Sequence, residues 1–130
     1  WFGEGYDLCF LSQLFILILV TKYRLKVLLG SVEVRLEEVL KMITENHGYQ
    51  LLAARVHHGD HVHVFVSAKP VVRIPDVVAV LKSNSARLLF AEFPEIKFRL
   101  WGGHLWSEGY AVRTAGVVTS AKIEEYINRF

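Results

Sequence analysis

Residues 49–67 read YQLLAARVHHGDHVHVFVS, which is two runs of strand-forming residues around a short polar segment. The HHGD segment contains two turn formers, so the stretch predicts a hairpin with strands over Tyr49–Val56 and His61–Ser67. Successive side chains of a strand point to opposite faces of a sheet. The second strand is therefore expected to turn His61 and His63 to one face and its valines to the core.

The segments before the hairpin predict a strand and a helix. Leu14–Val20, LFILILV, is bulky and partly β-branched, which is typical of a central strand covered on both faces. A basic turn, TKYRLK, follows this strand. Ser31 is then expected to cap a helix that Gly48 ends. The apolar face of this helix is predicted to comprise Val32, Leu36, Val39, Leu40 and Ile43.

The segments after the hairpin predict a helix, a strand and a last helix. Pro75 marks the start of the second helix, and Pro94 is expected to close it. His104–Val112 is a further strand candidate, and Thr119 or Ser120 can cap a terminal helix. The order strand, helix, strand, strand, helix, strand predicts an α+β fold, a ferredoxin-like or RRM-like sandwich. Its antiparallel sheet is expected to carry helices on one face, with the terminal helix added.

Length and composition are those of a small folded domain. The 130 residues are 52% hydrophobic and 22% charged, so one domain is expected over residues 1–130, with residues 1–10 uncertain. The net charge of +2 allows a local basic patch but excludes no class of partner. The single cysteine, Cys9, excludes an internal disulfide and predicts a reducing, cytoplasmic location. Leu8–Val20 is shorter than the roughly 20 residues that span a bilayer, so no membrane association is expected.

His61 and His63 are candidate metal ligands. Side chains two residues apart on a strand lie about 6 to 7 Å apart on one face, so both imidazoles can converge on one divalent cation. Asp60 could orient an imidazole without itself binding the metal, or it could simply be a turn residue. His57 and His58 are expected to decorate the same turn. The competing interpretation is a solvated sheet face whose histidines titrate near neutral pH.

Tyr126 is a candidate nucleophile near the edge of the apolar side of the predicted terminal helix. A phenol oxygen can attack a phosphorus atom and form a covalent intermediate. A phenol with a pKa of about 10 is a poor nucleophile at pH 7, so a cation that clamps the phosphate oxygens would have to supply much of the stabilisation. The two candidates therefore depend on each other, and packing is the alternative role for this tyrosine.

A third set of residues combines positive charge with aromatic rings, the combination that holds single-stranded nucleic acid. The alternative is a pair of solvated helix faces and core tryptophans. The set comprises Lys22, Tyr23 and Arg24 after the first strand, Lys82, Ser83, Asn84, Ser85 and Arg87 on the second helix, and Trp101, His104 and Trp106 in the aromatic stretch. Among these, Lys22, Tyr23, Arg24, Lys82, Ser83 and Arg87 are the predicted DNA contacts.

Five ordered segments resemble the single-tyrosine HUH transposases of small bacterial and archaeal insertion sequences (Y1, TnpA-like), from about Leu14 to Phe130. They are TKYR, DHVHVFVSAKP, LKSNSARLLF, LWGGHLWSEGY and EEYINRF, and the HUH motif is His61-Val62-His63. The resemblance implies a transposase that cleaves and rejoins single-stranded DNA at the element's ends. It further implies that Mg²⁺ or Mn²⁺ is bound by the two histidines and that Tyr126 forms a 5′-phosphotyrosine link.

The resemblance also implies a homodimer, in which the metal site of one subunit meets the tyrosine of the other, and hairpin DNA as the partner. The sequence departs from the family pattern at Phe130, where a glutamine often reaches the metal. Asp60, Asn128 or water could complete the shell, or the tail is altered, or activity is weakened. Tyr110 and Tyr23 are competing phenols, which are interpreted as strand packing and DNA contact.

Two other functions stay open. The first alternative is a non-catalytic nucleic-acid-binding module on the same fold, for which the phenylalanine in place of glutamine is the best support. The second is a hydrolase in which a histidine-bound cation activates water.

Overall fold

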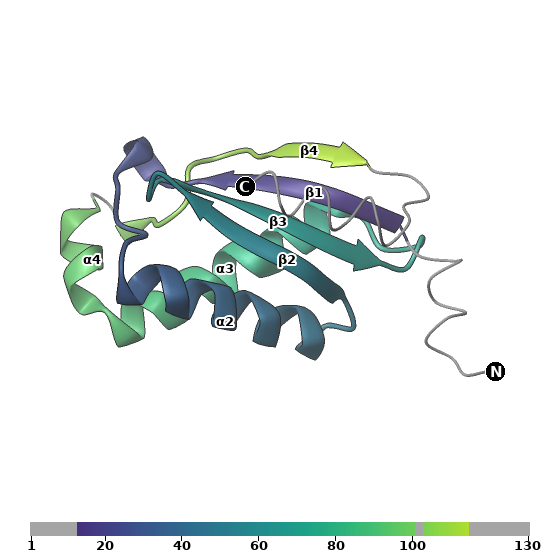
Figure 1. The fold of residues 1–130 in the computed structure, drawn as a ribbon, viewed down its shortest axis with the longest axis horizontal. Helices are drawn as coiled ribbons and strands as arrows, with labels where there is room; N and C mark the ends of the chain where they lie inside the picture. Colours follow the sequence, from purple (N-terminus) through teal and green to yellow (C-terminus); the bar gives the residue numbers. More distant parts are fainter. Residues whose placement is uncertain (1–12, 101–102, 115–130) are drawn as a thin grey trace.

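A four-stranded antiparallel sheet forms the centre of the computed structural model, which describes residues 13–100 and 103–114 (Figure 1). The strand order is β2-β3-β1-β4, so β1 and β3 are the inner strands. This order and the alternation of strands and helices confirm the expected α+β, ferredoxin-like fold. The strands are β1 (Gln13–Val20), β2 (Gln50–His57), β3 (His61–Ala68) and β4 (Ala111–Thr114).

Two long helices, α2 (Ser31–Asn46) and α3 (Ile74–Glu92), cover one face of the sheet (Figure 1). Alternate residues of β1 from Phe15 to Leu19 and of β3 from Val62 to Ala68 face these helices and are buried. Each large apolar side chain so buried contributes about 1.5 to 3 kcal/mol. The helices contribute leucines at helical spacing to the same cluster. The core includes Phe15, Leu17 and Leu19 of β1, Val62, Val64 and Val66 of β3, Leu36 and Leu40 of α2, and Leu81 and Leu89 of α3.

The opposite face of the sheet carries the histidines. Residues paired across antiparallel strands point to the same side, and His63 is paired with Ile18 of β1 and with Arg55 of β2. His61 is paired in the same way with Val20 and His57. The prediction that the histidines and the core valines of β3 lie on opposite faces is therefore confirmed.

The start of α2 differs from the prediction. Gly30, with φ of 58°, is the N-cap, and Ser31 is the first helical residue without a capping hydrogen bond from its side chain. The positive φ explains the difference, because the chain enters the helix from a left-handed turn that glycine adopts at little cost. The end of the helix before Gly48 agrees with the prediction.

The aromatic stretch after α3 also differs from the prediction. Pro94 does follow the end of α3, but it also begins a short helix, α4 (Pro94–Arg99), that was not expected. The predicted strand over His104–Val112 is wrong in its bounds, because β4 begins only at Ala111, and Trp106 forms an isolated bridge with Thr21. The predicted terminal helix lies outside the described residues.

Side-chain contacts tie the segment before β4 to α3. Trp106 is 7% exposed, and its indole Nε1–H donates to Ser85 Oγ at 2.9 Å. The Lys82 ammonium group donates to the carbonyl oxygens of Ser107 (2.8 Å) and Gly109 (2.6 Å). These bonds join Trp106, Ser107 and Gly109 to α3, while the same segment also meets the end of β1, where Ser107 N–H donates to Val20 O at 2.8 Å.

Candidate metal and DNA site

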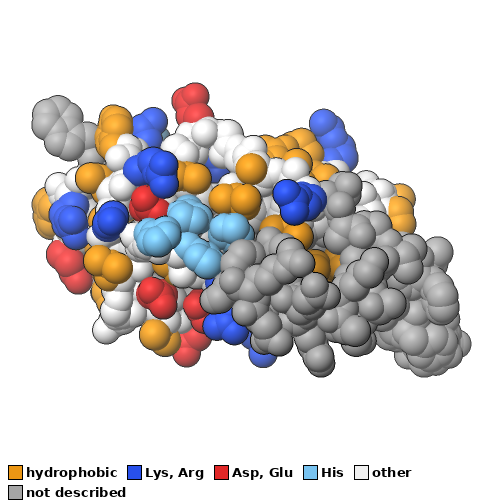
Figure 2. Space-filling model, turned by 45° about the horizontal axis from the view of Figure 1, so that its top comes forward, with side chains coloured by type: hydrophobic (Ala, Val, Ile, Leu, Met, Phe, Trp, Pro, Cys, Tyr) orange, Lys and Arg blue, Asp and Glu red, His pale blue; other side chains and the backbone are white. Residues whose placement is uncertain are grey.

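The β2–β3 hairpin brings His57, His61 and His63 together on the sheet face opposite α2 and α3. Ring centroids are 5.4 Å apart for His61 and His63, 4.8 Å for His57 and His63, and 5.6 Å for His57 and His61. Figure 2 shows the histidine side chains gathered in one surface patch, with Lys and Arg side chains to one side and Asp and Glu side chains also beside it. The two predicted ligands therefore lie side by side, as a shared cation would require.

The turn between the strands has the backbone that such hairpins need. His58 and Gly59 have φ values of 56° and 72°, and left-handed turn residues match the twist of the flanking strands. A Cβ atom at Gly59 would lie 2.7 Å from Leu29 Cδ2, so this glycine also allows close packing of the loop before α2. The turn thus fixes the register that places His57 opposite His61.

Asp60 holds the ring of His61. Its carboxylate Oδ1 lies 2.6 Å from His61 Nδ1, and a carboxylate only accepts, so Nδ1 carries the proton and donates. The Nε2 atom of His61 is then the one with a lone pair for a cation, which is the arrangement of carboxylate-supported histidine ligands. The hydrogen bond from His61, with a smaller effect of Arg24, holds the pKa of Asp60 below its usual value. The positioning role considered for Asp60 is therefore supported by this geometry.

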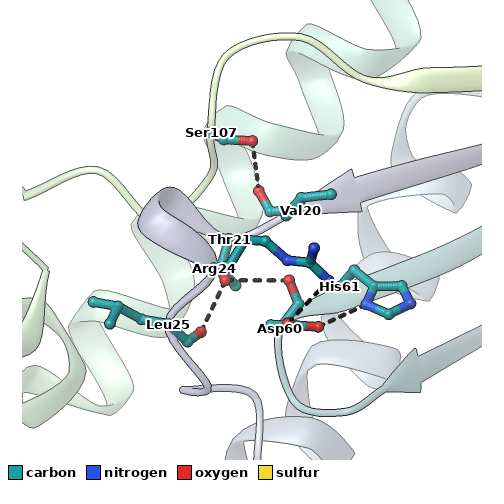
Figure 3. A network of polar contacts seen from close by, with 7 residues as sticks. All are labelled: Val20, Thr21, Arg24, Leu25, Asp60, His61 and Ser107. Atoms are coloured by element: carbon teal, nitrogen blue, oxygen red, sulfur yellow. Dashed lines mark hydrogen bonds and ion pairs between the residues drawn. The ribbon is translucent and has the colours of Figure 1, made fainter.

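Arg24 reaches the same carboxylate from the other side. Its guanidinium Nη2 lies 3.4 Å from Asp60 Oδ2, while its side chain is 71% exposed (Figure 3). Arg24 lies in the short 3-10 helix η1 (Lys22–Arg24), where Tyr23 and Arg24 have φ values of 60° and 53°. A solvent-exposed cation at the edge of the histidine patch is suited to a phosphate that approaches the two histidines.

Buried hydrogen bonds lock the start of η1 onto the hairpin (Figure 3). The backbone N–H of Thr21 donates to Asp60 O at 2.9 Å, and its hydroxyl lies 2.8 Å from Leu25 O and 3.1 Å from Asp60 O. Leu28 N–H donates to Gly59 O at 3.0 Å. Arg24 and the histidines therefore belong to one rigid unit rather than to two independent loops.

Burial keeps two of the imidazoles uncharged. It lowers the pKa of His63 to about 4, and the neighbouring His57 and His61 act in the same direction. Burial also lowers the pKa of His57, with smaller effects of His61, His58 and Arg55. Metal ligation requires neutral imidazole, so the site is prepared for a cation at neutral pH. In the present orientation of the side chains, no three His, Cys, Asp or Glu among the described residues are arranged to share a metal ion.

The remaining predicted DNA contacts form a second group. A cavity of about 390 Å³ lies between η1, α3 and residues 103–108, and Lys22, Lys82 and Ser83 line it together with His104. Burial lowers the pKa of Lys82, which Glu108 only partly offsets. The ammonium group of Lys82 is engaged by the two carbonyls described above, and the hydroxyl of Ser83 donates to Ala79 O at 2.7 Å.

Other members of the basic and aromatic set are placed differently. Arg87 is exposed on α3 and donates to Asn84 Oδ1 at 3.2 Å, and Tyr23 is 64% exposed, so both are accessible to a ligand. Ser85 and Trp106 are buried and bonded to each other, which supports the core interpretation for this tryptophan. Tyr110 is 38% exposed and directly precedes β4. Trp101, Tyr126, Asn128 and Phe130 lie outside the described residues.

Sequence reasoning missed two features of the site. His57 was expected only to decorate the turn, although strand pairing across a three-residue connection places it opposite His61. The ion pair between Arg24 and Asp60 joins residues 36 positions apart in the chain, and only the packing of η1 on the hairpin brings them together. Hairpin register could have revealed the first feature, whereas no local pattern signals the second.

Across residues 13–100 and 103–114, no helix has the length and apolar character needed to cross a membrane.

Known proteins resemble this chain in sequence and in fold. Residues 11–129 match the family described as transposase IS200 like. The chain is 41% identical over 111 residues to the ISDra2 transposase TnpA of Deinococcus radiodurans, covering 85% of this chain and 79% of that protein. It is 28% identical over 111 residues to the transposase for insertion sequence element IS200 of Salmonella typhimurium, covering 85% and 72%.

Solved structures resemble this chain in fold as well. A crystal structure of a candidate transposase from Deinococcus radiodurans R1 superposes with a TM-score of 0.75 at 40% identity, covering 91% of this chain and 90% of that one. A tyrosine transposase bound to a REP hairpin shares the fold, with a TM-score of 0.60 at 9% identity, covering 89% and 62%. The chain therefore belongs to the family of IS200-like transposases, the single-tyrosine type that its ordered motifs resemble.

Proposed function

We propose that this transposase cleaves and rejoins single-stranded DNA at the ends of an insertion sequence through a covalent link to Tyr126, acting in the cytoplasm. The observation that carries the proposal is the pair of imidazoles on one face of β3, with the His61 ring held by Asp60 at 2.6 Å. That a protein of the same fold is described as bound to a REP hairpin supports hairpin DNA as the partner.

The residues fit a hard divalent cation, Mg²⁺ or Mn²⁺, on His61 and His63. When bound, such a cation supplies charge neutralisation at the phosphate oxygens. Asp60 keeps the His61 ring in the tautomer with a free Nε2 lone pair. Arg24 adds a second positive group beside the phosphate, because its guanidinium is exposed next to this carboxylate.

The chemical step belongs to the tyrosine. The phenol oxygen of Tyr126 forms a bond to phosphorus, and the bond from phosphorus to the 3′ oxygen breaks. The phenol loses its proton and the leaving oxygen gains one, so a free 3′-hydroxyl and a 5′-phosphotyrosine result. The energy of the broken bond is retained in the link, which allows rejoining by attack of another 3′-hydroxyl without a nucleotide cofactor.

We also propose that the active protein is a homodimer in which each site combines the histidines of one subunit with the tyrosine of the other. Within the described part of the chain, β4 forms one edge of the sheet, and Val112 in this strand is 44% exposed. An open edge with exposed apolar side chains suits a contact with a second copy.

One denaturing gel tests the reaction. Labelled hairpin DNA with a single-stranded flank is incubated with protein and Mg²⁺ or Mn²⁺, and a protein-linked product is expected. Tyr126→Phe should abolish this adduct and leave hairpin binding intact, while the matched control Tyr110→Phe should still form the adduct. His61→Ala and chelator should both reduce adduct formation. An undiminished adduct in Tyr126→Phe would remove this tyrosine from the mechanism.

The same gel separates the rival functions. Hairpin binding with neither cleavage nor adduct would favour the non-catalytic DNA-binding module, which the phenylalanine at position 130 supports. Cleavage without a protein-linked product would favour a hydrolase that activates water.

A further inference from the structure

The histidine cluster contains one more imidazole than the proposed cation site uses. His57 ends β2 and is paired directly with His61, so its side chain lies on the same face as both proposed ligands. Its ring centroid is 4.8 Å from that of His63 and 5.6 Å from that of His61. His58, at the turn, is farther away, with centroid distances of 6.4 Å to His57 and 6.0 Å to His61.

Of the three ring separations, one lies within the range for imidazoles on a common ion and two lie slightly above it. With a metal–nitrogen distance of about 2.1 Å, each ring centroid lies about 3.2 Å from the metal. Ligand angles between octahedral and tetrahedral values then place the centroids roughly 4.5 to 5.2 Å apart. The observed separations of 4.8, 5.4 and 5.6 Å exceed this range by at most a few tenths of an ångström.

Ring orientation is what a bound ion would change. The rings of His57 and His61 are inclined by only 17° and stack, whereas two ligands of one ion direct a nitrogen at a common point. The torsion that turns an imidazole about its Cβ–Cγ bond is broad and two-fold, so this torsion itself permits His57 to reorient. His61 is the fixed member, because Asp60 holds its Nδ1 at 2.6 Å.

We propose that His57 is a third protein ligand, so that His57, His61 and His63 form a three-imidazole centre that prefers Mn²⁺ and softer divalent ions to Mg²⁺. This inference rests on the proposed cation site and names the class of ion it takes. Mg²⁺ prefers oxygen ligands and retains its waters, whereas imidazole nitrogen favours transition metals. A third ring also provides a ligand from this chain where the family glutamine is replaced by Phe130.

Binding measurements on purified full-length protein test the proposal without any DNA reaction. Titration calorimetry with Co²⁺, Mn²⁺ and Mg²⁺ is performed on the wild type, His57→Ala, His61→Ala and His58→Asn. His58→Asn is the matched control, since asparagine tolerates the left-handed backbone at φ of 56°. His57→Ala should weaken Co²⁺ and Mn²⁺ binding by at least about 10- to 100-fold, the loss typical for removal of a residue that hydrogen-bonds to a metal ligand. Mg²⁺ binding should weaken by less than about 2-fold.

A second measurement needs no variant. In the Co²⁺-loaded wild type, proton NMR should show hyperfine-shifted ring signals from three histidines. Shifted signals from only two histidines would overturn the role of His57 and leave the two-histidine site standing. The same conclusion would follow if His57→Ala bound Co²⁺ as tightly as His58→Asn while His61→Ala lost binding. Unchanged Co²⁺ affinity in His61→Ala would instead overturn the proposed cation site itself.

Discussion

Replacing Asp60 by asparagine isolates the support that this residue gives to His61. The asparagine side chain has nearly the same size and can accept from the ring, but the bond of 2.6 Å from Nδ1–H to a carboxylate becomes a neutral one. Hydrogen bonds to charged groups contribute about 1.5 to 3 kcal/mol and neutral ones about 0.5 to 1.5. The expected loss is about 1 to 1.5 kcal/mol, which corresponds to about 5- to 12-fold in metal affinity.

Calorimetric titration of Mn²⁺ into Asp60→Asn measures this loss directly. Asp76→Asn is the matched control, because it removes the same charge from an exposed position in the first turn of α3. The backbone carbonyl of residue 60, which accepts from Thr21, is retained, so the fold should be unchanged by circular dichroism. Equal Mn²⁺ affinities for the wild type and both variants would refute the inference that the carboxylate orients a metal-binding imidazole.

Three further outcomes follow from the structure. Gly59→Ala should lower the free energy of unfolding by about 1 to 2 kcal/mol in urea melts, because alanine is strained at φ of 72° and meets Leu29; unchanged stability would contradict the turn geometry. The metal-free protein should lose about 1 to 2 kcal/mol of its free energy of unfolding as pH falls from about 6.5 to 4. The pKa of His63 is lowered in the folded state, so in this pH range unfolding takes up a proton at His63, and solvent screening reduces the energy that the whole pKa shift would give. His63→Gln should flatten that pH dependence. Mixed and reassorted His61→Ala and Tyr126→Phe subunits should regain about a quarter of wild-type adduct if sites are shared between subunits, and none if each subunit acts alone.

Much of the fold could be predicted because its local patterns agree with its tertiary contacts. The alternation in β3 is the same in the sequence and in the sheet, since its valines are fully buried and its histidines are not. The helix over Ser31–Asn46 followed from the spacing of its apolar residues and from Gly48. The prediction failed in the aromatic stretch, where Trp106 bonds to Ser85 and pairs with Thr21 only as an isolated bridge, so the continuous strand begins at Ala111.

The candidate site was predictable only in part. The two histidines of the motif are two positions apart in sequence, so strand geometry alone brings them together. Arg24 reaches Asp60 because η1 folds over the hairpin tip, and long-range packing of this kind leaves no local signature. The roles of Tyr126 and of the DNA contacts remain predictions to be tested by the experiments above.

The position of β3 inside the sheet determines how the proposed cation site responds to warming. This strand is paired with β1 from His61 to Ala68 and with β2 from His61 to Ser67, the latter ladder containing one bulge. Amides in such a strand exchange with solvent mainly through opening of the entire domain, not through local fraying. Cation affinity should therefore persist on warming until the domain melts as a whole, and the slowest-exchanging amides should be those flanking the paired imidazoles.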